Sequence, residues 1–266
     1  MMKKLSCLAL IALMPAAAWA QSTAAPDDST DPTTASRWRL GLGVAVFNNG
    51  YVGRGSQVLP LPIVDYAGDR FFIHGIMGGV HLLKSDGFVV DAIITPGFNN
   101  IDASDFSRAD LARRGINRSD LQNRDISVDA GFAATWTGGL GQLKAVAKTD
   151  ISGNSNGAEY SLEYGYPLQW DGFKITPNVG ATFLSAKVAD YYYGIHPEEV
   201  RRGVPGYTPG GSLIPDVGVN VIRPLGPKWA LMINVKYNAL PNKISNSPLI
   251  DSSHGTAVMV GFSRAF

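Results

Sequence analysis

The sequence is poor in cysteine, in charge and in long apolar runs. Its single cysteine, Cys7, lies within the first twenty residues, and no later stretch approaches the roughly 18 apolar residues of a membrane-spanning helix. Charged residues make up 17% of the chain and the formal net charge is +1, so no basic face points to a nucleic-acid partner. Zinc-site and EF-hand spacings are absent as well. We therefore expect no disulfide, no metal site, no cofactor and no nucleic-acid partner.

The first twenty residues have the pattern of a secretory signal peptide. Lys3 and Lys4 form its positive end, residues 5–14 form an apolar run, and Ala18-Trp19-Ala20 is a small-x-small cleavage sequence. We expect cleavage between Ala20 and Gln21. Export without a remaining thiol is typical of the outer membrane of a Gram-negative bacterium, which is where we expect the protein.

Two further segments follow the signal peptide (residues 1–20). Residues 21–36 are polar and poor in apolar side chains, so they cannot bury a core and should form a flexible leader. Ordered structure should begin at Arg37, and residues 37–266 should form one domain. Mean hydropathy near zero (+0.02) suits a membrane β-barrel, whose strands are half polar, better than a helical membrane protein.

The last thirteen residues, His254–Phe266, alternate between two unlike faces. Bulky apolar side chains occupy most even positions, and small side chains occupy the odd ones. An ordinary strand of a soluble sandwich would also alternate. A final strand that ends on an aromatic residue, however, suits a barrel that closes its last strand on its first. Phe266 also resembles the terminal signal by which outer-membrane barrels are recognised for insertion.

Similar alternating runs recur from Trp38 onward. Their second face carries polar residues such as Asp129, Glu163 and Asn234 beside many glycines and alanines, which fits the wall of a lumen. Aromatic residues lie at or near the ends of the runs, as in the girdles at a membrane interface. These residues are Trp136, Tyr166, Trp170, Trp229 and Tyr237.

The connections alternate between tight turns and long loops, which is the outer-membrane pattern. Counting the runs gives eleven strands, whereas a bacterial single-chain barrel should have an even number. Residues 70–83 are the place where a hairpin could be hidden, because Gly75–Gly79 could reverse the chain. We therefore predict an all-β, antiparallel, up-and-down transmembrane barrel of twelve strands, with ten as the alternative, and short turns that all lie on the periplasmic side.

Four loop motifs resemble those of the MltA-interacting protein (MipA/OmpV) family, over about residues 37–266. They are Tyr51-Val52-Gly53-Arg54-Gly55, Asp150-Ile151-Ser152-Gly153, the tyrosine-rich Asp190–Glu199 and Ser247-Pro248-Leu249-Ile250-Asp251. The resemblance implies an outer-membrane scaffold that interacts with a lytic transglycosylase and a murein synthase. A small-solute channel and a surface adhesion or stress-response barrel are the alternatives. The family provides no catalytic residues to carry over.

The tyrosine-rich loop is the candidate interaction site, through Tyr191, Tyr192, Tyr193 and His196. These side chains could bind a partner or pack across the barrel mouth, and packing suits amphipathic tyrosine rings slightly better. A hydrolase centred on His196 or His254 is a less favoured reading, so we expect no enzymatic activity.

The arginines of residues 108–124 alternate with aspartates, which favours a solvated loop of balanced charge. The alternative reading is a surface that binds lipopolysaccharide, beside the ordinary contact of a barrel with outer-membrane lipid.

Overall fold

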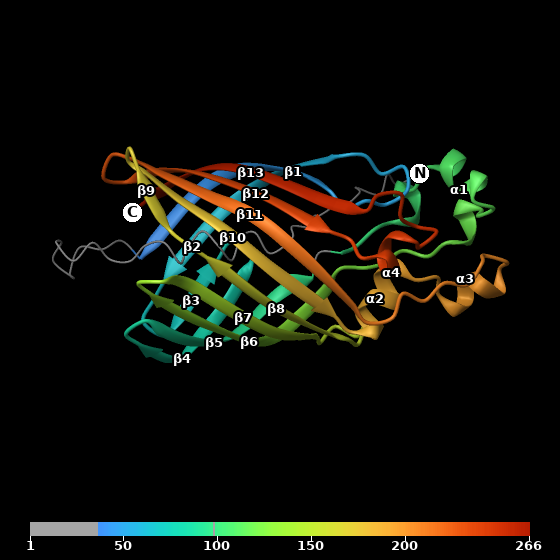
Figure 1. Cartoon of the computed structure of the whole chain (residues 1–266), viewed down its shortest axis with the longest axis horizontal. Helices are drawn as coiled ribbons and strands as arrows, with labels where there is room; N and C mark the ends of the chain where they lie inside the picture. The colour runs from blue at the N-terminus through green and yellow to red at the C-terminus, as the bar shows by residue number, and fades with distance from the viewer. Residues whose placement is uncertain (1–36, 98) are drawn as a thin grey trace, which may run out of the picture.

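The computed structural model describes residues 37–97 and 99–266, and these residues form a β-barrel (Figure 1). The signal peptide expected at residues 1–20, its cleavage after Ala20 and the leader expected at residues 21–36 lie outside the described residues. The strands are β1 (Trp38–Asn48), β2 (Gln57–Ala67), β3 (Phe71–His74), β4 (Met77–Ser85), β5 (Phe88–Gly97), β6 (Ser127–Gly138), β7 (Gly141–Asp150), β8 (Ala158–Gly165), β9 (Leu168–Trp170), β10 (Phe173–Leu184), β11 (Ser212–Leu225), β12 (Trp229–Ala239) and β13 (His254–Ala265).

The barrel has twelve strands, because β8 and β9 are two parts of one strand. Both pair with β10, and the interruption between them lies opposite Pro177, whose carbonyl accepts from the Tyr166 N–H. Every pairing is antiparallel, and β13 pairs with β1 from Arg39↔Ala265 to Asn48↔Thr256, which closes the sheet. The predicted fold class and strand count are confirmed. The predicted hairpin within residues 70–83 is also present, with its turn at Gly75 and Ile76.

The two faces of the strands are those that the alternation predicts. Leu42, Val128 and Phe132 are exposed on the outside, whereas Asp129 and Asn234 point inward and are buried. An apolar outer surface of this kind is stable against lipid and would be unfavourable in water. Ile126 is an exception to the alternation: it precedes β6 and packs against the inward-facing cluster around Phe47 and Leu59.

Several charges inside the barrel are paired with one another. The Lys148 Nζ atom lies 2.6 Å from Asp129 Oδ2 and 3.0 Å from Glu159 Oε2. Across the lumen wall, Lys236 Nζ lies 2.9 Å from Asp216 Oδ1 and makes a longer contact with Glu163. Pairing compensates part of the cost of removing these charges from water.

The barrel has two unlike ends, which we call the short-turn end and the long-loop end. The turns after β4, β6, β9 and β11 all lie at the short-turn end, as predicted (Figure 1). The expectation that all short turns share one end is wrong for the two-residue turn between β3 and β4, which faces the long-loop end. Exposed aromatic residues surround the short-turn end, namely Trp38, Trp136, Tyr166, Trp170 and Trp229.

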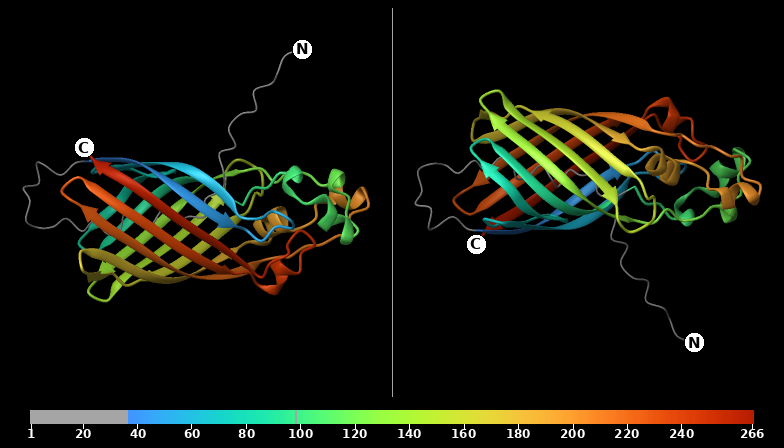
Figure 2. Two further views of the ribbon diagram at one scale, coloured as in Figure 1. Left: turned by 90° about the horizontal axis from the view of Figure 1, so that it is seen from above. Right: turned by 90° about the horizontal axis from the view of Figure 1, so that it is seen from below.

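The long-loop end contains all the helices of the described residues. They are η2 (Ala103–Asp105), α1 (Arg108–Arg113), η3 (Arg118–Asp120), α2 (Ala186–Tyr193), α3 (Pro197–Arg201) and α4 (Asn242–Ser245). Figure 2 shows them gathered beyond one end of the strands. Within the described part of the chain, no helix is long and apolar enough to cross a membrane.

Candidate functional site

The long loops pack into one apolar cluster at the barrel mouth, which we call the loop plug. It draws side chains from the loops after β1, β5, β10 and β12, and from the adjoining strand ends. Its buried members are Tyr51, Val52, Ile101, Phe106, Leu111, Ile116, Leu121, Leu184, Val188, Ala189, Tyr192, Tyr193, Ile195, Val204, Ile214, Leu240, Ile244, Leu249 and Ile250. A contiguous cluster of this kind is the core of a small domain, so the loops close the mouth as a packed body.

Helix α2 contributes most of the tyrosine-rich motif. Its buried residues Val188, Ala189, Tyr192 and Tyr193 follow the spacing of one helical face. Tyr192 and Tyr193 are only 1% and 5% exposed, whereas Tyr191 is half-buried on the other side. Three consecutive tyrosines therefore divide into two that pack into the plug and one at its surface. The packing that the sequence favours for this motif is therefore what Tyr192 and Tyr193 show.

Tyr51 lies at the centre of the plug. Its ring stacks on Tyr193 with a centroid distance of 5.8 Å and meets Phe106 edge to face. Its hydroxyl donates toward the backbone oxygens of Asn99 (3.1 Å) and Tyr192 (3.3 Å), which joins loops far apart in the sequence. Burial raises the pKa values of Tyr51 and Tyr193 well above the ordinary tyrosine value, so both phenols are neutral at any physiological pH.

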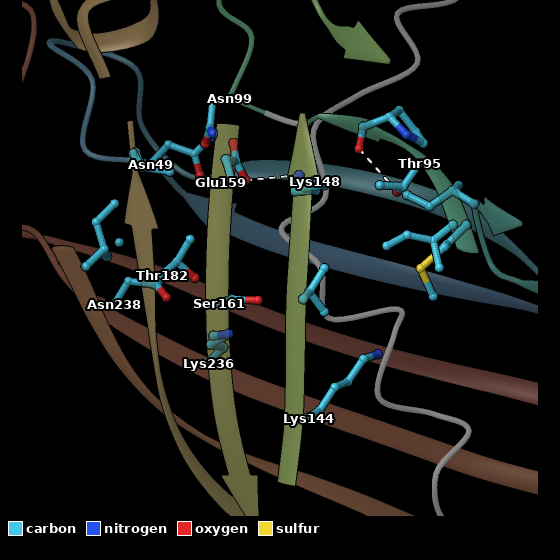
Figure 3. Close-up of a pocket in the computed structure, with 18 of the residues that line it drawn as sticks. Asn49, Thr95, Asn99, Lys144, Lys148, Glu159, Ser161, Thr182, Lys236 and Asn238 are labelled. Atoms are coloured by element: carbon cyan, nitrogen blue, oxygen red, sulfur yellow. Dashed lines mark hydrogen bonds and ion pairs between the residues drawn. The ribbon is translucent and has the colours of Figure 1, made fainter. Parts of the chain in front are cut away.

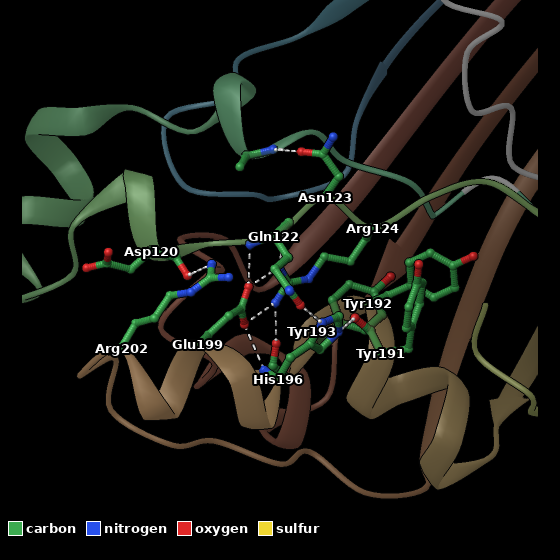
Figure 4. A network of polar contacts seen from close by, with 12 residues as sticks. Asp120, Gln122, Asn123, Arg124, Tyr191, Tyr192, Tyr193, His196, Glu199 and Arg202 are labelled. Carbon is green, nitrogen blue, oxygen red and sulfur yellow. Dashed lines mark hydrogen bonds and ion pairs between the residues drawn. The ribbon is translucent and has the colours of Figure 1, made fainter.

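A buried ion pair joins two of the loops (Figure 4). Arg124 Nη2 lies 2.7 Å from Glu199 Oε2 and 2.9 Å from the Gly194 oxygen, and both side chains are 0% exposed. Glu199 also accepts from the backbone N–H groups of Gln122 and His196, each at 2.7 Å. Burial opposes ionisation of Glu199, but these hydrogen bonds outweigh it and hold its pKa below the ordinary value.

His196 belongs to the same network, at the start of α3. Its Nε2 atom lies 2.9 Å from the Tyr191 oxygen, and its ring stacks on that of Tyr191 at 5.2 Å. Burial and the nearby Arg124 guanidinium lower the pKa of His196, so the imidazole is neutral at pH 7. Tyr191 and His196 also border an open groove on the outer face of the plug, together with Tyr207 and Arg201.

Three of the four motifs that carried the family resemblance meet in the plug. Gly53 donates its N–H to Asp251 Oδ2 at 3.2 Å, and the Ser247 hydroxyl donates to the Tyr193 oxygen at 2.5 Å. Gly53 has a φ of +68°, and a Cβ at this position would lie 2.1 Å from the Ser107 Cβ, so only glycine fits. The Tyr51, Tyr191 and Ser247 motifs are therefore parts of one packed structure.

A cavity of about 140 Å³ lies in the lumen beneath the plug (Figure 3). Apolar side chains from the plug form part of its lining, through Leu184, Tyr193, Ile214 and Leu240. Lys148 and Glu159, from the neighbouring strands β7 and β8, also line the cavity, and Figure 3 shows their ion pair.

The arginine-rich segment has a structural role that its sequence does not reveal. Arg124 is fully buried, and Arg118 donates to the Ser104 oxygen at 2.9 Å and to the Phe106 oxygen at 3.1 Å. Arg114 donates to the Pro248 and Ile250 oxygens at 3.1 and 2.6 Å. The reading of this segment as a solvated loop is therefore wrong for Arg124, whose partner Glu199 lies 75 residues away in the sequence. Arg124 resembles the other loop arginines in sequence, so no local signal marks it.

Among the described residues, the two candidate catalytic histidines, His196 and His254, have partners other than those of a hydrolase. His196 contacts Gln122 and a backbone oxygen, and His254 contacts the Ser252 hydroxyl at 3.3 Å. Within residues 37–97 and 99–266, neither forms a hydroxyl–imidazole–carboxylate series, and no three His, Cys, Asp or Glu side chains are placed to hold a metal ion. The absence of catalysis, metal and cofactor remains a prediction.

Comparison with known proteins identifies relatives along most of the chain. Residues 40–266 match the family described as MltA-interacting protein MipA. The chain is 29% identical over 234 residues to YiaT of Escherichia coli (strain K12), with 88% of this chain and 92% of that protein covered. It is 26% identical over 233 residues to the MltA-interacting protein of the same strain, covering 86% and 90%. It is 23% identical over 134 residues to the outer membrane protein OmpV of Vibrio cholerae serotype O1, covering 50% and 52%.

Proposed function

Because the chain belongs to the MltA-interacting protein MipA family and is an outer-membrane β-barrel, we propose that it is a membrane-anchored scaffold for murein-processing enzymes. A lytic transglycosylase is the first expected partner, since a relative's name states that it interacts with MltA. A murein synthase is the second. The barrel supplies a rigid anchor in the outer membrane, and outer-membrane lipid and lipopolysaccharide surround it.

The observation that carries this proposal is the closed mouth. A channel needs an aqueous path along the barrel axis, but the loop plug fills the mouth with buried apolar side chains and a buried ion pair. A twelve-stranded barrel is also narrower than the 16–18 strands of porins. The plug therefore supports a structural role over axial conduction of solutes.

The partner surface should lie at the short-turn end. Outer-membrane barrels place their short turns in the periplasm and their long loops outside the cell. Murein and the enzymes that process it lie in the periplasm, so a scaffold for them must use the turns rather than the plug. In this proposal Tyr192 and Tyr193 hold the plug together. Tyr191 and His196, at its outer groove, are left to contact molecules outside the cell.

Site-specific photocrosslinking in intact envelopes tests this proposal. A photoreactive amino acid would replace Asp86, Gly139 or Lys228 in the short turns, with Arg113 and Arg201 on the plug as matched exposed controls. We expect crosslinks to a lytic transglycosylase from at least one short-turn position and from neither plug position. Crosslinks from the plug alone, or none from any position in correctly folded protein, would contradict the proposal.

A further inference from the structure

The wall of the barrel is incomplete above the short β3–β4 hairpin. Strand β2 pairs with β3 only through Asp65–Ala67, so residues 57–63 have β1 as their single strand partner. On the other side, the β4–β5 ladder ends at Gly78↔Ile94, and residues 95–97 pair with β6 alone. At the level of the hairpin turn, two strands separate β2 from β5, a distance of about 14 Å at normal strand spacing. Figure 1 shows β3 and β4 as a short hairpin at the end opposite the helices.

Prolines occupy both edges of this gap. The Val64 oxygen accepts from the Gly75 N–H, so Val64 directs its backbone groups toward β3. Along an antiparallel strand, the backbone N–H and C=O groups of successive residues point to alternate sides. Those of Pro62 and Pro60 therefore point to the same side as those of Val64, which above β3 is the open edge of β2. Across the gap, Pro96 of β5 is paired with Val128 of β6. Val128 donates its N–H to the Ser152 hydroxyl and accepts from the Ile151 N–H, so its backbone groups point away from β5. The backbone of Pro96 therefore points away from β6 and toward the gap.

Proline at these positions makes an open edge tolerable in a membrane. An unpaired N–H in contact with hydrocarbon costs several kcal/mol, and proline has none. The outer rim of the gap is apolar, because Val58, Ile94 and Val128 are exposed beside it. The gap therefore opens toward lipid and not toward water.

The inner side of the gap leads to the cavity beneath the plug. Ile76 and Met77 from the hairpin, and Ile93 and Pro96 from β5, line both the gap and the cavity. Hydrogen-bonding side chains face them from the far wall, namely Ser161, Thr182 and Asn238 (Figure 3). An engineered apolar cavity of about 150 Å³ holds one benzene molecule, so a cavity of about 140 Å³ fits a molecule of similar size.

We propose that the gap between β2 and β5 is a lateral portal through which a small amphipathic molecule, with an apolar body and one hydrogen-bonding group, passes between the membrane and the cavity. A simple phenol has this chemistry. Its ring would lie against Ile76, Met77 and Ile93, and its hydroxyl would face Ser161 and Thr182. The plug closes the mouth at the long-loop end, so a molecule coming from the membrane would reach the cavity through the side of the barrel and not through that mouth. This activity adds to the scaffold role and does not depend on it.

Thiol labelling in phosphatidylcholine vesicles tests the portal, because the chain that remains after the expected cleavage at Ala20 contains no cysteine. In that background, Met77→Cys places a thiol at the portal. Met232→Cys is a matched control, since Met232 also points inward and is buried, but lies in a fully paired strand. We expect a lipid-soluble pyrene maleimide to label Cys at position 77 many times faster than at position 232. We also expect millimolar p-cresol to slow the labelling at position 77 several-fold.

Three results would overturn the proposal. Equal labelling rates at the two positions would show that there is no portal at position 77. If a sulfonated, water-soluble maleimide labelled position 77 faster than the pyrene maleimide does, entry would be axial. If p-cresol did not slow the labelling at position 77, the cavity would not bind the proposed phenol-like molecule. Heat-modifiable gel mobility checks that each variant is folded. Ile93→Cys replaces Met77→Cys if the latter does not fold, because Ile93 lines the same cavity and is 5% exposed.

Discussion

Among single residues, Arg124 and Glu199 have the largest expected effect on the loop plug. Removing one partner of a buried ion pair leaves the other charge buried and uncompensated, which costs about 3–5 kcal/mol. We expect Arg124→Ala to lower the free energy of plug opening by this amount, measured by hydrogen exchange of plug amides. The double variant Arg124→Met with Glu199→Leu should lose much less, because it leaves no buried charge.

The exposed pair Arg201–Glu198 in α3 is the matched control. Its side chains are 71% and 45% exposed and lie 2.9 Å apart, so Arg201→Met should cost about 0.5 kcal/mol or less. Similar losses for Arg124→Ala and Arg201→Met would mean that the buried pair does not hold the plug.

His196 should make the plug sensitive to acid. Its pKa in the folded protein lies below the ordinary value of 6.5, so the folded plug prefers the neutral imidazole. As pH falls through 6.5, the opened state takes up a proton that the closed state does not, and stability is lost. We expect plug amides to exchange several-fold faster at pH 5.5 than at pH 7.5, after correction for intrinsic exchange rates. In His196→Gln this difference should shrink, and an unchanged difference would assign it to another group.

At the level of strands, the two faces of β12 should respond differently to charge. Ile233 lies between the inward-facing Met232 and Asn234 and so points toward lipid, whereas Asn234 donates through its Nδ2 to Asn220 Oδ1 in the lumen. Arg at position 233 near the membrane midplane should cost about 2–4 kcal/mol. Asn234→Arg should cost far less, because the new charge would face the polar lumen and not lipid. The comparison uses denaturant titration of refolded protein, and equal losses would argue against lipid on the outer face.

The strands were predictable because the period-2 pattern reports a physical boundary between lipid and lumen. Residues of β1 and β13 alternate without interruption, and both strands were found at the expected positions. The β8–β9 interruption and the four-residue β3 were not predicted, because both depend on where a neighbouring strand ends. The loop plug could not be predicted from the sequence either, because it also depends on contacts between distant parts of the chain. Apart from the buried face of α2, its residues follow no period, and contacts such as Tyr51–Tyr193 exist only once the barrel brings the loops together.

For the whole molecule, closure of the barrel depends on the last strand. Phe266 donates its N–H to the Trp38 oxygen at 3.0 Å, and its side chain is 59% exposed on the outer surface. Its full burial in lipid would be worth roughly 1.5–3 kcal/mol. We propose that its larger role is in the insertion signal. Deletion of Phe266 should therefore lower the amount of folded, heat-modifiable protein several-fold, while inserted molecules keep near-normal stability. An undiminished yield would show that this residue carries no such signal.

The central claim is that the loop plug closes the barrel along its axis, and single-channel recording in planar lipid bilayers tests it most directly. Purified, heat-modifiable protein would be compared with a 16-stranded porin, a class that leaves an aqueous channel. We expect the porin to give discrete conductance steps and this protein to give none at neutral pH, because packed side chains and the Arg124–Glu199 pair fill its mouth. Stable, repeated conductance steps from the folded wild-type protein would contradict the claim.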